Sequence, residues 1–199
     1  MKIQEDFQLT SGRLCLDLVS TLRARSEERI ELLDQPDALA HWVSLTQFAD
    51  LEGDLSVCDR SLAQAIILRE AVHGLVVAFR EGAAYRQRDI DIVNAAANPP
   101  ALIPQLIYDQ RLTHAFAASG QSDLLTSVMS EIARDAIDLI TTAPETRVKN
   151  CENHKCERLF YDDSQAQRRR WCSMDRCGNR SKVKRYRSKN TKEQLGPDH

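Results

Sequence analysis

The strongest constraint on the fold is the spacing of four cysteines near the C-terminal end of the chain. Cys151 and Cys156 are separated by 4 residues, Cys172 and Cys177 are separated by 4 residues, and 15 residues lie between the two pairs. Zinc favours a tetrahedron of thiolates, and ligands that arrive in two local pairs lose less chain entropy on assembly. The spacing predicts one structural Zn²⁺ bound by all four cysteines, since four thiolates leave no position for a catalytic water.

Two disulfides and an iron–sulfur cluster are the alternatives for these cysteines. Disulfides require an oxidising compartment, and the first ten residues, MKIQEDFQLT, do not resemble a signal peptide. An iron–sulfur cluster suits a short, basic segment less well. His154 lies between the first two cysteines and is a further candidate ligand, but we expect it to be exposed because four thiolates already complete the shell.

The net charge of −2 conceals a strong asymmetry along the chain. Residues 147–192 contain 15 Lys and Arg against 5 Asp and Glu, a balance of +10, whereas residues 1–146 contain 12 against 22, a balance of −10. One zinc ion with four thiolates would leave the basic part at about +8. The chain therefore consists of an acidic body and a basic tail.

The body has the apolar periodicity of a mainly helical α+β domain with a small sheet. We expect a short strand at Phe7–Leu9, and the buried run from Arg13 to Leu22 fits either a helix or a strand. The segment from Leu102 to Phe116 fits a hairpin, or one strand and an irregular piece. The expected helices run from Pro36 to about Ala49, from Asp59 to near Gly82, over Asp89–Ala97 and from Ser122 to Thr141.

The basic part has the order of a treble-clef-like zinc finger. We expect a strand over Arg158–Tyr161, a turn at Asp162–Ser164 and a second strand over Gln167–Trp171. A helix from about Asp175 to Asn190 would follow and supply the last ligand. So small a unit has little apolar core, so we expect its folding to depend on the metal.

We divide the chain into a body at 1–146, a zinc finger at 147–192 and a tail at 193–199. Pro144 ends the last helix of the body, and the charge changes sign directly after it. A linker this short indicates that the body and the finger touch.

The motif Cys177-Gly178-Asn179-Arg180 makes the C-terminal part recognisable, because it resembles the CGNR zinc-finger family. The preceding segments 160–164 and 169–171 also fit that family's pattern. Upstream, residues 12–21 resemble the opening of the ABATE domain that usually accompanies this finger, although members often have Asn where this chain has Ser20. The resemblance covers nearly the whole chain.

The resemblance implies a bacterial protein whose family is proposed to act in stress-related transcription regulation. It also implies that the four cysteines are the zinc ligands and that the body is an α+β domain. Both implications agree with the patterns described above.

The basic tail favours DNA binding as the function of the finger. DNA carries one negative charge per ~1.7 Å of duplex, so clustered Lys and Arg gain affinity by releasing counterions. A basic helix on a zinc-fixed hairpin is suited to a major groove, with strand arginines on the phosphates. The candidate contacts are Arg168, Arg169, Arg170, Arg176, Arg180, Lys182, Lys184 and Arg187.

Two other partners stay open for the same surface. RNA would use Phe160, Tyr161, Trp171 and Tyr186 as stacking platforms between arginines, although Trp171 fits a core role better. A protein partner, or the acidic body itself, would use the basic tail as a docking face. The finger would then be a scaffold.

The sequence favours a non-enzymatic protein of the cytoplasm with no membrane segment. The histidines of the body are scattered and form no catalytic pattern. Asp17, inside an apolar run, needs a buried partner, for which Arg13 and Arg69 are the candidates, and a pocket lined by Asp17 and Arg13 is the alternative. The body is also a candidate for binding a small-molecule effector or for forming a homodimer.

Overall fold

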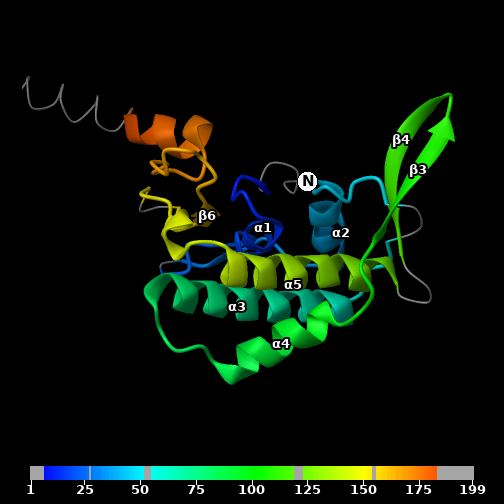
Figure 1. Cartoon of the computed structure of the whole chain (residues 1–199), viewed down its shortest axis with the longest axis horizontal. Coiled ribbons are helices and arrows are strands. Elements are labelled where there is room, and N and C mark those ends of the chain that lie inside the picture. Colours follow the sequence, from blue (N-terminus) through cyan, green and yellow to red (C-terminus); the bar gives the residue numbers. More distant parts are fainter. Residues whose placement is uncertain (1–6, 27, 52–54, 119–122, 154–155, 183–199) are drawn as a thin grey trace, which may run out of the picture.

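Five helices form the body of the protein in the computed structural model, which describes residues 7–26, 28–51, 55–118, 123–153 and 156–182. The two long helices, α3 and α5, pack against each other, and α4 packs against both (Figure 1). The short helix α1 contacts α3 and α5, and α2 contacts α3. The helices are α1 (Leu14–Val19), α2 (Pro36–Ser44), α3 (Asp59–Glu81), α4 (Gln87–Ala97) and α5 (Leu124–Thr142).

Both long helices begin and end at residues suited to these positions. The Cys58 side chain and the Ser61 hydroxyl exchange hydrogen bonds with each other's backbone N–H at the start of α3. Gly82 ends α3 with a φ of 62°, a left-handed conformation that glycine adopts at little cost. The Asp123 carboxylate accepts a hydrogen bond from the Thr126 N–H at 2.8 Å and caps α5. The bounds of α3 and α5 agree with the helices that the apolar periodicity predicts, to within two residues.

A single apolar cluster fills the space between the helices. Its largest fully buried side chains include Trp42, Phe48, Leu16 and Ile132. Burying such a side chain stabilises a fold by about 1.5–3 kcal/mol. The helical body thus has an apolar core, to which the finger adds the buried side chains of Val148 and Leu159.

Three two-stranded antiparallel sheets complete the fold over the described residues and confirm the expected α+β class with little sheet. Residues 13–22 form α1 and then the start of β1, which resolves the ambiguity of that run in favour of a helix. Residues 103–117 form a hairpin, which is the first of the two alternatives expected for this segment. The pairs are β1 (Leu22–Arg23) with β2 (Ile30–Glu31), β3 (Ile103–Asp109) with β4 (Arg111–Ala117), and β5 (Val148–Asn150) with β6 (Leu159–Tyr161).

Two expected strands are wrong. Phe7 and Leu9 form no strand; they pack against the body core as an extended segment, and the Phe7 ring lies 6.0 Å from His41. The expected second strand of the finger, Gln167–Trp171, is also irregular. In the structure, β5 is the strand that pairs with β6. In the body, helix α2 ends at Ser44, five residues before the expected end at Ala49.

Helix α3 is long enough and apolar enough to cross a membrane by length and composition alone. Its apolar residues, however, contribute to the body core, and Arg69 lies near its middle with an exposed fraction of 2%. Contacts with α1, α2, α4 and α5 also surround it. These features are those of the central helix of a globular core.

Candidate metal centre and basic surface

The four predicted ligands converge at one point of the finger. Cys151 directly follows β5, Cys156 lies in the loop after it, Cys172 precedes a helical turn over Met174–Gly178, and Cys177 lies within that turn. Their four Sγ atoms lie within 4.8 Å of one another. The backbone N–H of Cys151 donates to the Arg158 carbonyl at 2.8 Å, which fixes the knuckle that carries the first pair.

The spacing of the sulfurs fits a tetrahedral zinc ion. The Sγ atoms of Cys156 and Cys172 are 3.6 Å apart, and those of Cys172 and Cys177 are 3.8 Å apart. A Zn–S bond of about 2.3 Å in a tetrahedron gives sulfurs about 3.8 Å apart. All four cysteines are free of disulfides, and only Cys156 is not fully buried. The cluster is a structural zinc site, as the spacing predicted.

The crowded thiols also need a cation on electrostatic grounds. Hydrogen bonds from Cys156 and Cys172 lower the pKa of Cys151 to about 2. The hydrogen bond to Cys151 raises the pKa of Cys156 to about 11, and the Cys172 pKa is raised by the same cluster. Four thiolates therefore do not form side by side without a positive ion, and Zn²⁺ supplies that charge.

Gly178 allows the turn that carries the last ligand to pack closely. A Cβ atom there would lie 2.8 Å from Sδ of Met174 and 3.3 Å from Cδ1 of Trp171. The chain continues as a helix up to Lys182, where the described part ends. The finger is thus a hairpin, β5–β6, followed by a helix that bears Cys177.

Asp162 organises the irregular segment between the two cysteine pairs. Its side chain is fully buried, and it accepts hydrogen bonds from Lys149 Nζ at 2.6 Å, from the Ser164 hydroxyl at 2.5 Å and from the Arg169 N–H at 2.9 Å. Burial alone would raise the pKa of this carboxyl, but these three donors hold it well below its ordinary value. The sequence places Asp162 in a turn and in a family-like segment, but it does not indicate that this carboxylate is the buried polar centre of the finger.

Two of the predicted nucleic-acid contacts are occupied inside the finger. The Arg169 guanidinium donates to the Tyr161 and Cys172 carbonyls and lies 5.0 Å from the Phe160 ring centre. Arg170 pairs with Glu152 and stacks 5.1 Å from the Trp171 ring centre. These arginines hold the knuckle together, so the structure gives them a structural role.

Four other predicted contacts are exposed and have no acidic partner among the residues that the structure describes. Two of the expected contacts, Lys184 and Arg187, lie outside the described residues, as does His154. We name the exposed set the basic cluster: Arg168, Arg176, Arg180 and Lys182.

The finger contacts the body through α1 and the segment before it. The Tyr161 N–H donates to the Ser11 carbonyl at 2.7 Å, and Arg158 donates to the Gln8 side chain at 2.9 Å. Gly12, with a φ of 79°, passes so close that a Cβ there would lie 3.0 Å from the Tyr161 carbonyl oxygen. Contacts between α1 and β6 agree with the expectation, drawn from the short linker, that the two parts touch.

Asp17 is buried in α1 near this contact, but the prediction that Arg13 or Arg69 pairs with it is wrong. Its carboxylate accepts a hydrogen bond from the Ser11 N–H at 2.9 Å, and no arginine of the described body pairs with it. Burial raises the pKa of the Asp17 carboxyl to about 6. The positive charge of Arg158, in the finger, acts in the opposite direction and lowers that pKa. The carboxylate was thus correctly identified as buried, but it faces the finger and a backbone donor.

Arg13, the first candidate partner of Asp17, points to α5 instead. Its guanidinium pairs with Asp135 at 2.7 Å and with Asp138 at 2.7 Å. Asp135 also accepts the Cys15 N–H at 2.8 Å, and the Arg13 guanidinium lies 5.9 Å from the Tyr161 ring centre. Arg13 therefore joins α5, the start of α1 and the finger.

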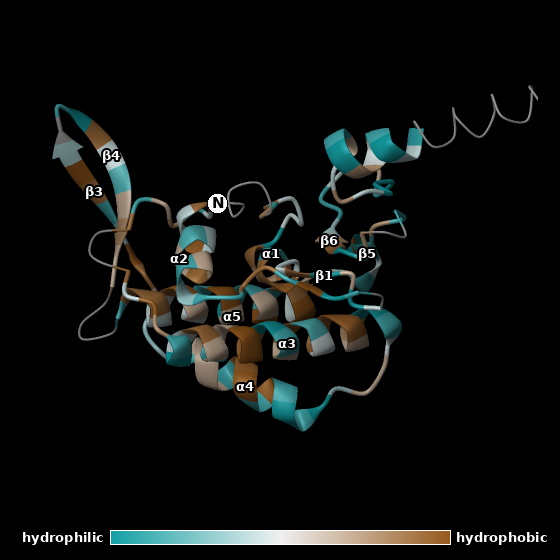
Figure 2. Ribbon diagram, turned by 180° about the vertical axis from the view of Figure 1, so that it is seen from behind, coloured by the Kyte–Doolittle hydropathy of each residue, from teal (hydrophilic) through white to brown (hydrophobic). Residues whose placement is uncertain are grey.

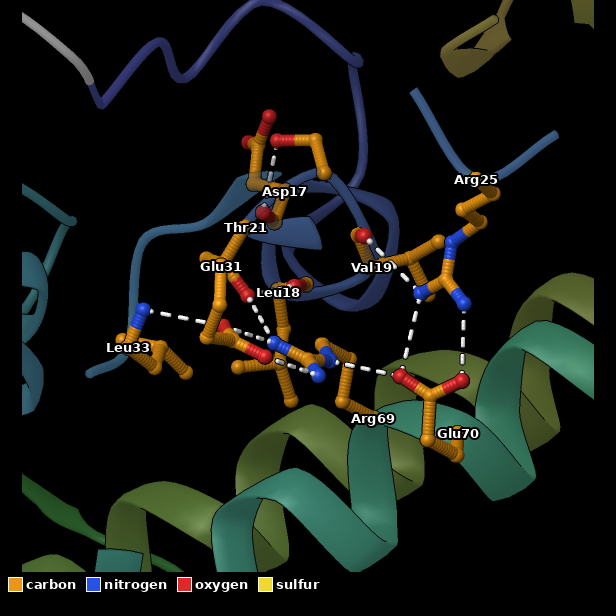
Figure 3. Close-up of polar contacts among 10 residues, drawn as sticks. Asp17, Leu18, Val19, Thr21, Arg25, Glu31, Leu33, Arg69 and Glu70 are labelled. Atoms are coloured by element: carbon orange, nitrogen blue, oxygen red, sulfur yellow. Dashed lines mark hydrogen bonds and ion pairs between the residues drawn. The ribbon is translucent and has the colours of Figure 1, made fainter. Parts of the chain in front are cut away.

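Arg69, the second candidate, is buried and is the centre of a network of ion pairs with partly exposed carboxylates (Figure 3). It makes two hydrogen bonds to the Glu31 carboxylate at 2.6 and 2.7 Å and one to Glu70 at 2.8 Å. Glu70 also pairs with Arg25 at 2.7 Å, and the neighbouring Ser26 donates to Glu157 in the finger. This network joins α3, the β1–β2 hairpin and the zinc knuckle.

The fold and the site define a protein with a helical body and a structural four-cysteine zinc finger. Comparison with protein families gives its identity more closely. Residues 12–143 match ABATE, described as "Putative stress-induced transcription regulator", and residues 147–190 match the CGNR zinc finger. The chain belongs to the ABATE family and carries a C-terminal CGNR zinc finger. A search of curated proteins found no match.

Proposed function

We propose that the zinc finger binds double-stranded DNA through the basic cluster and that the protein regulates transcription. The observation that carries this proposal is the set of four exposed cations with no acidic partner among the described residues. They lie on a unit that four cysteines and one zinc ion fix in shape. The family's description as a transcription regulator supports a nucleic-acid partner.

The charge distribution supports phosphate contacts by these residues. Arg176 and Arg180 are four residues apart in the helical segment, so they lie on one side of it. Arg168 comes from the loop before the second cysteine pair. Free cations of this kind release DNA counterions on binding, whereas Arg169 and Arg170 are already held by protein groups. Lys184 and Arg187 extend the proposed contact beyond the described residues.

RNA is the less supported alternative. Phe160 is fully buried, and Trp171 packs against the cysteine cluster, so neither offers an open stacking face. Tyr161 is half-buried at the contact with the body, and Tyr186 lies outside the described residues. If the basic cluster instead binds a protein, the chain should not bind duplex DNA even at low salt. The salt series described below distinguishes this alternative from DNA binding.

The division into a body at 1–146, a finger at 147–192 and a tail at 193–199 remains part of the proposal. In it the body is not an enzyme and contributes assembly or effector binding, and the protein acts in the bacterial cytoplasm. The contacts from Arg69 to Glu70 and from Glu70 to Arg25, with the bond from the neighbouring Ser26 to Glu157, support such a role, because they connect α3 with the zinc knuckle.

The test compares two variants of the zinc-loaded full chain across a salt series. Replacing Arg176, Arg180 and Lys182 with Ala should reduce the slope of log affinity against log salt by about 0.9 for each phosphate that is no longer neutralised. The matched control replaces three exposed cations of the body, Arg60, Arg86 and Arg88, and should leave the slope unchanged. Equal slopes for both variants would remove the basic cluster from the interface.

A further inference from the structure

The β3–β4 hairpin projects from the body at the end opposite to the zinc finger (Figures 1 and 2). It carries the three most exposed large apolar side chains among the described residues. The exposed fraction is 77% for Leu106, 76% for Tyr108 and 68% for Leu112. Figure 2 shows apolar stretches on both strands of this projecting segment.

These side chains share one face of the hairpin. The register pairs Leu106 with His114 and Tyr108 with Leu112, and directly opposed residues point to the same side. At the base of the same face, Phe116 packs edge-on against Phe48 of the body, with ring centres 5.3 Å apart. An apolar row thus begins at Phe116, which packs against the body core, and continues along the hairpin to side chains that are exposed among the described residues.

A surface of this kind is expected to be covered in the working protein. A two-stranded hairpin is marginally stable alone in water, and contiguous exposed apolar patches mark interaction sites. The turn residues of the hairpin do not supply the missing cover, because Gln110 at the tip is itself exposed. The patch needs a partner that matches it in chemistry.

We propose that the apolar face of the β3–β4 hairpin is a self-association surface, on which a second copy of this chain packs the same face of its own hairpin. Residues 103–117 contain one acidic and one basic residue, so the hairpin is electrically neutral apart from His114. The rest of the body has an excess of 10 acidic residues, which opposes contact between two bodies at other places. The projecting hairpin brings two copies together with the least repulsion.

The hairpin edges favour this face-to-face contact over pairing of strand edges. The Phe116 N–H donates to the Asp50 carbonyl at 3.1 Å, so part of the outer edge of β4 is already occupied. By the alternation of antiparallel strands, Pro104, opposite Phe116, then directs its backbone to the outer edge of β3. Because proline lacks an N–H, that edge has a missing donor. Two-fold packing of the faces needs no such donor.

The size of the patch sets the strength of the contact. The three exposed side chains offer on the order of 400 Å² on each copy, hence about 800 Å² for the pair before the flanking residues are counted. This lies below the about 1,200 Å² typical of stable complexes. The dimer is therefore weak, with dissociation in the micromolar range or above, and its population depends on protein concentration.

Sedimentation velocity of the zinc-loaded full chain, without nucleic acid, tests this inference over a concentration series. The wild type should shift from monomer to dimer as concentration rises. Replacing Leu106 and Leu112 with Lys should keep the chain monomeric at every concentration. The matched control, Gln105→Lys with Thr113→Lys, adds the same charge to the opposite face of the same hairpin and should retain the dimer.

The helical circular dichroism and the zinc content of both variants verify that the body and the finger stay folded. A wild type that remains monomeric throughout would overturn the inference, and so would a dimer that survives in the Leu106→Lys, Leu112→Lys variant. Loss of the dimer in both variants would equally contradict a contact through one face. The absence of nucleic acid keeps these outcomes independent of DNA binding by the finger.

Discussion

The body and the finger of this protein are held together by different means. In the body, one cluster of buried apolar residues joins all five helices, with Trp42, Phe48 and Ile132 among the largest members. In the finger, Val148 and Leu159 belong to the body's cluster, and a separate small cluster consists of three of the four cysteines and Phe160, with Cys156 and Trp171 at its margin. The body can therefore rely on apolar burial, whereas the finger requires its metal ion.

The polar groups that the two regions bury repeat this contrast. The body buries Arg69 in α3 and satisfies it with Glu31, a residue 38 positions away. The finger buries Asp162 and satisfies it with donors from its own loop, such as Ser164 and Arg169. Long-range pairing ties the body together, and local pairing shapes the zinc knuckle.

Removal of zinc should give the largest effect and separate the two regions. Structural zinc contributes about 10–16 kcal/mol in isolated fingers. We expect Cys172→Ser, or a chelator, to unfold the finger while the helices of the body persist. Zinc content and amide hydrogen exchange over 147–182 would measure this. Cys58→Ser, in the exposed cysteine of the body, is the control and should retain one zinc per chain.

A cavity in the body core should destabilise the body and leave zinc binding by the finger intact, the reverse of zinc removal. Ile132 on α5 is fully buried, and truncation of such a side chain costs about 2–5 kcal/mol. We expect Ile132→Ala to reduce the unfolding free energy of the body, followed by its helical signal in urea, by that amount. Zinc binding at saturating metal should remain. Equal destabilisation of the finger would show that the two regions fold as one cooperative unit, against the comparison drawn above.

The ion-pair network of Arg69 should give a smaller loss. Glu31→Gln leaves the buried guanidinium with Glu70 and Thr21 as its remaining partners. Breaking a fully buried pair costs about 3–5 kcal/mol, but Glu31 is one-third exposed and water compensates in part, so we expect about 2 kcal/mol. Urea unfolding measures it. Glu28→Gln, at an exposed position of the same hairpin, should change stability little.

Asp17 should make the contact between body and finger depend on pH. Burial raises its pKa from 3.8 to about 6, so the folded protein holds a proton that the unfolded chain has already released. Stability from this group is therefore present at low pH and is lost as pH rises through about 6. Asp17→Asn lacks this loss. Relative to wild type, the variant should gain about 1–1.5 kcal/mol between about pH 5 and 7.5.

Urea unfolding at both pH values, with zinc in excess, measures this difference. The comparison with wild type at each pH cancels the titration of the zinc ligands. A constant difference between Asp17→Asn and wild type would show that the carboxyl does not titrate in this range.

The sequence predicted those features that depend on neighbouring residues. The apolar lines of α3 and α5 lie within single segments, and the cysteine spacing encodes the ligand set directly. The expected strand at 167–171 failed because Asp162 and Lys149 bond the backbone of that segment and hold it irregular. Partners far apart in sequence, such as Arg69 with Glu31 and Arg13 with Asp135, have no local signal.

The basic surface shows the same limit. A run of three arginines at 168–170 suggested three equivalent DNA contacts. Only the fold shows that Arg169 and Arg170 are bound to carbonyls, Glu152 and aromatic rings, whereas Arg168 has no acidic partner among the described residues. The charge pattern therefore does not indicate which of these arginines are already bound by protein groups.

Single replacements in the basic cluster should give the smallest effect. Arg180→Ala should weaken duplex binding and reduce its salt slope by about 0.9, the value for one neutralised phosphate. Neither zinc content nor unfolding should change, because no described residue depends on Arg180 for an ion pair. Arg88→Ala, at an exposed position of the body, is the control. A slope equal to that of wild type would exclude Arg180 from the interface.

The most direct test of the whole account is duplex DNA binding by the full chain, measured by fluorescence anisotropy in a salt series with zinc and after its removal. We expect salt-dependent binding with zinc, and loss of that binding without zinc while the helical signal of the body remains. Binding that is unchanged by zinc removal, or absent at low salt with zinc present, would contradict it.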